Sequence, residues 1–262
     1  MTKPPFETTV RDGVCQIARE STEWLSTGFD GGRWHADVAY NCTVPSGWSD
    51  TDLRGYVDQR LDATDFEAEG PALLTGVDQR HARVAVFDPV GVVVTAGLSN
   101  PATVPPRSVG SNTTSEANTV VDGDGGDDQP PSPTEYTPGT INIIAVTTRA
   151  LEPGALANLV SVVTEAKTAT LQKQTGFSGT TSDAVVVGCD RSGEPTPFSG
   201  SATSVGRAAR ACVRDALTAS LASRYVDEEP PQSVAAAKYG CETTVETTVS
   251  TPTRDAETEP TE

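Results

Sequence analysis

The chain has 262 residues, with 36 acidic against 19 basic side chains, a net charge of −17 and a sequence pI of about 4.4. Nucleic-acid binding is excluded as a function class, because no basic surface is available to release counterions from phosphates. The acidic excess runs along the whole chain, and such a surface stays hydrated at high ionic strength, where self-repulsion is screened. The composition therefore indicates a halophilic acidic protein.

No segment of the sequence suggests export or a membrane span. The first residues, MTKPPFETTVRDGV, lack the apolar core of a secretory signal. No later apolar run approaches the length needed to cross a bilayer. We therefore expect a cytoplasmic protein without a membrane span.

The first third of the chain predicts strands, a glycine-rich turn and a helix. Alternating apolar residues predict one or two strands over residues 6–20. Residues 24–32 predict a strand that runs into a turn containing Gly31 and Gly32. Two adjacent glycines permit a positive φ and a close backbone approach to a ligand, although an ordinary hairpin turn has the same signature. Leucine and valine at helical spacing predict a helix over residues 50–63.

Two strands and an insertion are predicted in the middle of the chain. The strands cover residues 83–87 and 90–96, and the second is so apolar that both of its faces should be buried. It ends in a turn that contains Ser99 and Asn100. Residues 103–138 are dominated by Pro, Ser, Thr, Asn, Gly and Asp, so we expect a disordered insertion. Its DGDGGDD segment resembles part of a calcium loop but lacks the glutamate and flanking helices of an EF-hand, so no metal site is predicted.

A strand and an amphipathic helix follow the insertion. Residues 140–147 predict a nearly continuous apolar strand, and a helical apolar stripe covers residues 155–173. Lys167 falls in the middle of this stripe, whereas Glu165 falls on the opposite side of the helix. Two interpretations of Lys167 are open: a stem that extends to solvent at the helix end, or a functional ammonium group.

A turn rich in hydroxyl groups comes next, over residues 177–183 (FSGTTSD). The turn contains Gly179 and Thr180 and ends at Asp183. It concentrates polar groups directly before an apolar strand, so it is a candidate for the functional site.

The expected fold is α+β or α/β: a single domain over residues 1–226, followed by an acidic, largely disordered tail over residues 227–262. A mixed sheet of buried strands, all too apolar to face water on either side, would be covered by two main helices. Its strands lie at 83–87, 90–96, 140–147 and 184–189, and the helices at 155–173 and 204–225.

Most catalytic motifs are absent from the sequence. There is no G-x-G-x-x-G after a strand, no Walker loop and no G-x-S-x-G elbow. Two histidines and five widely spaced cysteines indicate neither a metal site nor a disulfide framework. The remaining carboxylates, amides and hydroxyls suit general acid–base hydrolysis, or equally the binding of a polar ligand.

Six motifs in order resemble the adenosylcobinamide amidohydrolase family, and together they extend over roughly residues 10–225 apart from the insertion. They are S-T-G-F-D-G-G (26–32), V-T-A-G-L-S-N-P (94–101), G-T-I-N-I-I (139–144), T-E-A-K-T-A (164–169), G-T-T-S-D-A-V-V-V (179–187) and F-S-G-S-A-T-S-V-G (198–206).

The resemblance implies hydrolysis of the amide that joins the aminopropanol arm of adenosylcobinamide to the corrin ring. The products would be adenosylcobyric acid and 1-amino-2-propanol, for cobalamin salvage. Cobalt would belong to the corrinoid substrate, so the resemblance implies no cofactor of the protein's own.

Chemistry, rather than the resemblance, suggests the roles of individual residues. Asp183 or Glu165 would be the base that activates water, and Asp183 is preferred because Glu165 faces away from Lys167 on the helix. Lys167 would stabilise the tetrahedral oxyanion. The alternative mechanism uses a threonine nucleophile, Thr140 or Thr180.

Eight residues are predicted to contact the substrate. Asn142 and the backbone of Gly179 and Thr180 would position the carbonyl, and two glycine- and serine-containing turns would meet the amide-rich corrin rim. The full set is Gly31, Gly32, Ser99, Asn100, Thr140, Asn142, Gly179 and Thr180.

A non-catalytic corrinoid-binding or storage protein is the alternative function. It predicts stoichiometric retention of the ligand without release of aminopropanol. A homo-oligomer is compatible with either function.

Overall fold

The computed structural model describes residues 4–45, 47–48, 52–105, 141–237, 239–245 and 247–252. Nearly all of the predicted insertion lies outside these residues, as do Thr140 and the last ten residues of the tail. The expectations made for them stay predictions.

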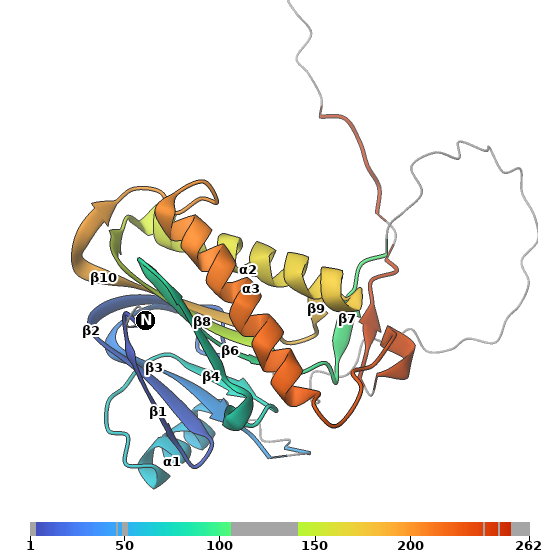
Figure 1. The fold of residues 1–262 in the computed structure, drawn as a ribbon, viewed down its shortest axis with the longest axis horizontal. Coiled ribbons are helices and arrows are strands. Elements are labelled where there is room, and N and C mark those ends of the chain that lie inside the picture. Colours follow the sequence, from blue (N-terminus) through green and yellow to red (C-terminus); the bar gives the residue numbers. More distant parts are fainter. Residues whose placement is uncertain are drawn as a thin grey trace, which may run out of the picture.

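A mixed sheet of eight strands forms the centre of the molecule, in the order β4-β3-β2-β10-β8-β6-β5, with β1 paired to β2 (Figure 1). β10 runs parallel to β8 and β3 parallel to β4, and the other pairs are antiparallel. The predicted mixed sheet is therefore confirmed. The strands are β1 (Glu7–Arg11), β2 (Val14–Ser26), β3 (Gly32–Thr43), β4 (Ala72–Thr75), β5 (Arg83–Phe87), β6 (Val90–Ala96), β8 (Ile141–Leu151) and β10 (Ala184–Thr196).

The two predicted main helices lie side by side over one face of this sheet (Figure 1). α2 (Pro153–Thr175) begins with a proline in its first turn and ends at Gly176, whose φ of 79° suits glycine. α3 (Ser204–Arg224) is capped by Thr203, whose side chain accepts from the Gly206 amide. A shorter helix, α1 (Leu53–Ala63), lies apart from these two helices and packs against β3 and β4.

The sheet curls so strongly that its β3–β4 end covers the second face of β6, β8 and β10. Side chains along β6 alternate between the two resulting cores: Val92 and Val94 pack under α2 and α3, while Val93 packs between the curled parts of the sheet. α1 covers the outer side of β3 and β4 through Val57. Both faces of β6 are therefore buried, as its apolar sequence predicts.

The burial predicted for the strand at 83–87 is wrong. β5 is the last strand of the sheet, and the side chains of Val84 and Phe87 are 45% and 64% exposed. An edge strand has one neighbour only, so its apolar residues are covered less completely.

A smaller sheet joins three distant parts of the chain, in the order β11-β7-β9. β7 (Pro101–Thr103) follows the strand β6, and β9 (Gly179–Thr180) belongs to the hydroxyl-rich turn. β11 (Cys241–Glu242) and the short 3-10 helix η2 (Val234–Ala236) come from the tail, and a second 3-10 turn, η1 (Gln79–His81), precedes β5. Part of the acidic tail thus pairs with β7, the strand that in turn pairs with the turn carrying the predicted site.

No helix among the described residues has the length and apolar character needed to cross a membrane.

Four of the five cysteines are buried, and only Cys241 is exposed. Burial raises the pKa of Cys42 to about 12 and that of Cys15 and Cys212 to about 11, and it also raises the pKa of Cys189. We therefore expect a thiol reagent at pH 8 to add once to the native protein and five times after denaturation, as read by intact mass. Two or more rapid additions to the native chain would contradict this burial.

The raised pKa values of the buried thiols also determine how the stability of the folded protein changes with pH. The pKa values of these folded thiols lie above the ordinary value of 9.0, so the unfolded chain loses these protons first. Their contribution to stability is complete below pH 9 and declines as pH rises from there towards 11 and 12.

Candidate active site

The predicted site lies where the smaller sheet meets the end of the large one. Pairing of β7 with β9 sets Pro101 opposite Thr180 and Ala102 opposite Gly179. The amide of Thr181 donates to the carbonyl of Asn100 at 3.0 Å. The turn after β6 therefore holds the hydroxyl-rich turn in place against the beginning of β10.

The ammonium group of Lys167 forms an ion pair with Asp183 at the end of this turn. Oδ2 of Asp183 accepts from Lys167 Nζ and, at 3.1 Å, from the backbone amide of Thr180, while Oδ1 accepts from the hydroxyl of Thr180. The side chains of Lys167 and Asp183 are only 7% and 12% exposed. Lys167 thus does not extend to solvent. The structure instead brings three predicted residues into one buried cluster, Lys167–Asp183–Thr180.

Gly179 allows the cluster to be this compact. A Cβ atom at this position would lie 2.9 Å from Asp183 Oδ2 and 3.3 Å from Lys167 Nζ. The glycine is therefore required by two charged side chains that approach its backbone, and not by a positive φ.

Asn100 is fully buried and shapes the hydroxyl-rich turn. Its Nδ2 donates to the hydroxyl of Thr181 at 2.6 Å and to that of Ser182 at 3.2 Å. Ser99 beside it is exposed, and its carbonyl accepts from the amide of Tyr239 in the tail. Asn100 is thus placed to position the turn, while Ser99 lies at the surface near it.

Asn142 lies on the other face of the sheet from Lys167. Its neighbour Ile143 packs under the helices, whereas Asn142 points between the curled parts of the sheet, where its Nδ2 donates to Asn41 Oδ1 at 2.8 Å and to the Leu74 carbonyl at 2.9 Å. Nδ2 of Asn41 in turn donates to the hydroxyl of Thr95 at 2.9 Å. The structure therefore separates Asn142 from the Lys167–Asp183–Thr180 cluster.

Asn41 was not among the predicted site residues. It belongs to a strand whose sequence contains no motif, and its partner Asn142 is 101 residues away in the chain. The useful signal is that a buried asparagine in an apolar strand requires a polar partner. Within the described part of the chain, Oδ1 of Asn142 has no hydrogen-bond partner.

The turn with Gly31 and Gly32 reaches the same end of the sheet. Thr27 anchors it, because its hydroxyl accepts from the amide of Val185 at 2.9 Å and its amide donates to the Val185 carbonyl at 2.9 Å. Val185 comes two residues after Asp183. Both glycines are exposed, and Gly32 has a φ of 107°.

The side chain of Glu165 points away from the Lys167–Asp183–Thr180 cluster. Its side chain is 63% exposed and pairs with Arg210 of α3 at 3.2 Å. The expected opposition of Glu165 and Lys167 across the helix is thus present, and the structure does not bring Glu165 to the cluster.

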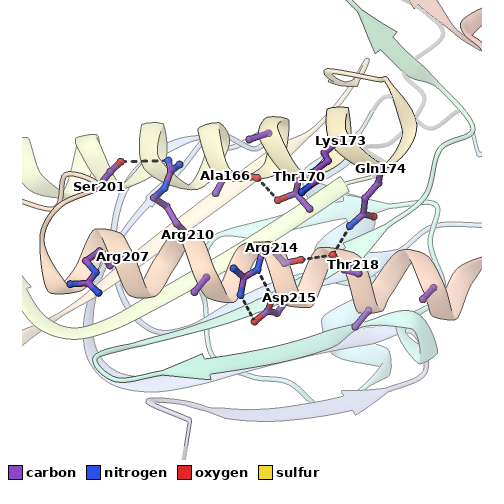
Figure 2. A pocket seen from close by; sticks show the side chains of 14 residues that line it. Ala166, Thr170, Lys173, Gln174, Ser201, Arg207, Arg210, Arg214, Asp215 and Thr218 are labelled. Carbon is purple, nitrogen blue, oxygen red and sulfur yellow. Dashed lines mark hydrogen bonds and ion pairs between the residues drawn. The ribbon is translucent and has the colours of Figure 1, made fainter.

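A separate groove of ≈ 890 Å³ runs between the exposed sides of α2 and α3 (Figure 2). It is lined by four cationic side chains, Lys173, Arg207, Arg210 and Arg214, and by Asp215, which pairs with Arg214. None of the predicted site residues lines it. The groove is therefore distinct from the candidate active site.

The last motif, at residues 198–206, contains residues that bind the N-terminal ends of α2 and α3. Ser199 is buried and donates to the Ala155 carbonyl at 2.6 Å, and Thr203 caps α3. The ion pair of Glu165 with Arg210 and the bond of Gln174 with Thr218 are in the same order on both helices, so α2 and α3 run parallel. This motif lies at their N-terminal ends, away from the end of α2 that leads into β9.

Comparison with known proteins agrees with the six motifs. A profile of the family described as adenosylcobinamide amidohydrolase matches residues 5–229. A protein of Halobacterium salinarum named adenosylcobinamide amidohydrolase is 50% identical over 249 residues, which cover 94% of this chain and 100% of the relative. A protein of Methanosarcina mazei with the same name is 27% identical over 218 residues, covering 79% of this chain and 94% of the relative.

Proposed function

The chain belongs to the adenosylcobinamide amidohydrolase family, and we propose that it hydrolyses the amide between the aminopropanol arm and the corrin ring of adenosylcobinamide. The products would be adenosylcobyric acid and 1-amino-2-propanol. The observation that carries the proposal is the buried cluster of Lys167, Asp183 and Thr180 at the meeting point of the family motifs.

This cluster contains the groups that amide hydrolysis requires. The carboxylate of Asp183 can take a proton from an attacking oxygen, and the ammonium group of Lys167 offsets negative charge that develops during attack. Because both side chains are almost buried, their electrostatic effect is stronger than it would be in water. In this proposal cobalt enters with the substrate, and the protein contributes no metal or organic cofactor.

The exposed turns around the cluster are the proposed contacts of the corrin rim. Gly31, Gly32 and Ser99 are exposed at this end of the sheet, which suits contacts with the amide-rich edge of the macrocycle. Asn100 acts instead through the turn that it holds. Thr140 keeps its predicted role as a substrate contact and lies outside the described residues.

Incubation with adenosylcobinamide followed by mass spectrometry tests the proposed function. We expect equal amounts of adenosylcobyric acid and 1-amino-2-propanol to appear with time. Stoichiometric retention of intact adenosylcobinamide without amine release would overturn the proposal in favour of a corrinoid-binding protein. The assay should be repeated across salt concentrations, because a chain with a net charge of −17 depends on screening of its surface.

Replacing Glu165 by alanine is expected to leave kcat/KM for amine release within about two-fold of the wild-type value. The side chain is exposed, and a surface ion pair such as that with Arg210 contributes only about 0–1 kcal/mol to stability. Steady-state amine release and thermal unfolding at one fixed salt concentration check this. A loss of ten-fold or more with unchanged unfolding would return Glu165 to the active site.

A further inference from the structure

We propose that Thr180 is the nucleophile and that hydrolysis passes through an ester between Thr180 and the corrin carboxyl group. This inference rests on the proposed amide hydrolysis and adds its covalent course. Of the two threonines that the sequence suggests as nucleophiles, Thr180 is the one whose surroundings the structure describes.

The hydrogen bond from Thr180 to Asp183 identifies the Thr180 hydroxyl as the candidate nucleophile. It donates to Oδ1 of Asp183, as a hydroxyl must if that carboxylate is to remove its proton. The neighbouring hydroxyls of Thr181 and Ser182 accept from Asn100. The hydroxyl of Thr180 is thus placed with its proton directed at a carboxylate, which is the geometry that activation requires.

Lys167 fixes the base in turn. It binds the second oxygen of Asp183, and the Thr180 amide binds the same oxygen at 3.1 Å, so the carboxylate cannot rotate away from the hydroxyl. The arrangement is a nucleophile, a base and a group that orients the base, which is the general design of activated hydroxyl nucleophiles. Thr180 is 8% exposed, so the attack would take place away from bulk water.

Direct activation of water by Asp183 is the alternative to attack by Thr180. Each carboxylate oxygen has two lone pairs. Oδ2 already accepts from Lys167 and from the Thr180 amide, so a water molecule must use the second lone pair of Oδ1, beside the Thr180 hydroxyl that already donates to this oxygen. The Thr180 hydroxyl is therefore the oxygen nucleophile that the structure already holds against the base. After acylation that hydroxyl has lost its proton, and Oδ1 becomes free to activate water.

The reaction balances without a further reactant. Oγ1 of Thr180 adds to the amide carbonyl carbon while its proton moves to Asp183. The C–N bond breaks, the proton passes from Asp183 to the nitrogen, and 1-amino-2-propanol leaves. Water then adds to the ester carbonyl and gives a proton to Asp183; the C–Oγ1 bond breaks, the proton returns to Oγ1, and the carboxylic acid is released.

Three variants separate a nucleophile from a residue that only shapes the turn. We expect Thr180→Val to lower kcat by about 10³-fold or more, because valine lacks the oxygen atom that forms the bond to the amide carbonyl carbon. Thr180→Ser, which keeps the hydroxyl, should retain activity within about 30-fold of wild type. Thr170→Val is the matched control, since its hydroxyl donates to the Ala166 carbonyl inside α2, and it should behave as wild type.

A chemical trap identifies the ester itself. Turnover in hydroxylamine should yield the hydroxamate of the corrin acid with wild type and with Thr180→Ser. Acid-quenched protein should carry the corrin acyl group on the tryptic peptide of residues 174–191, which contains Thr180. A structural role for the hydroxyl predicts neither product.

Each outcome decides the inference. Thr180→Val that is folded and within ten-fold of wild type would overturn it, as would an inactive Thr180→Val combined with wild-type turnover that gives no hydroxamate and no acyl peptide. Absence of amine release by the wild-type protein would instead overturn the proposed function, so the two failures are distinguishable. Thermal unfolding of every variant at fixed salt shows which of them are folded.

Discussion

Lys167→Met is expected to lower kcat/KM by about 10³-fold, because removal of one stabilising charge at an oxyanion costs two to three orders of magnitude. The Lys167 side chain is 7% exposed and pairs with Asp183, so its loss leaves this carboxylate without its buried ion-pair partner. Lys173→Met is the matched control: Lys173 is an exposed lysine on the same helix, and its loss should leave the rate of amine release unchanged.

A double-variant cycle separates the catalytic role of this ion pair from its role in stability. Lys167→Met or Asp183→Asn alone leaves one buried charge without its partner, which should lower the free energy of unfolding by about 3 kcal/mol. The double variant removes both charges and should recover most of that loss, but its activity should stay at the level of the weaker single variant. Denaturant unfolding at fixed salt, together with amine release, measures both quantities.

Additive losses of stability in the double variant would contradict the ion pair as the origin of the effect. Activity in the double variant above that of either single variant would show that the charges are not used in the reaction.

Gly179→Ala is expected to lower kcat by about 10²-fold while the fold is retained, because a displacement of about 1 Å at reacting groups has an effect of this size. The new Cβ would lie 2.9 Å from Asp183 Oδ2 and 3.3 Å from Lys167 Nζ. Both neighbours are ends of side chains, so they can move aside instead of forcing the backbone apart. The free energy of unfolding should therefore fall by only about 1 kcal/mol.

Gly154→Ala is the control for this variant. Gly154 is also part of the α2–β9 region of the chain, within the first turn of α2, and a Cβ there would meet nothing within 4 Å. It should keep wild-type activity and gain slightly in stability, since alanine favours a helix. Equal activity of Gly179→Ala and Gly154→Ala would remove the basis for placing the reaction at Gly179.

Hydrophobic periodicity predicted the main elements because it depends on near neighbours in the chain. The strand at 90–96 is present with the predicted bounds, while the strand predicted at 184–189 continues to Thr196 and the helix predicted at 155–173 covers Pro153–Thr175. The same periodicity placed Lys167 on the buried side of its helix and Glu165 on the exposed side, as the structure confirms. The strand at 83–87 is present with the predicted bounds, but its burial was predicted wrongly, because its sequence carries no sign of its place at the sheet edge.

The pairing of distant residues could not be predicted in this way. Thr27 meets Val185 from 158 residues away, and Asn41 meets Asn142 from 101 residues away. The first contact continues the antiparallel pairing of β2 with β10. The second joins β3 and β8, which are not neighbours in the sheet, so it depends on the curl that the twist and bulges of the strands produce. Asn142 was predicted to position the carbonyl together with Gly179 and Thr180, and in the structure its side chain points between the curled parts of the sheet, where it bonds to Asn41 and Leu74.

The sequence by itself determined the family through six ordered motifs, the identity of the polar groups available for chemistry, and the place of Lys167 on the apolar side of its helix. Only the tertiary structure decided that this lysine meets Asp183 and that Asp183 accepts the hydroxyl proton of Thr180. The physical reason is that composition and periodicity specify which side chains are buried, whereas partners inside the protein are chosen by how helix, sheet and turn pack against each other.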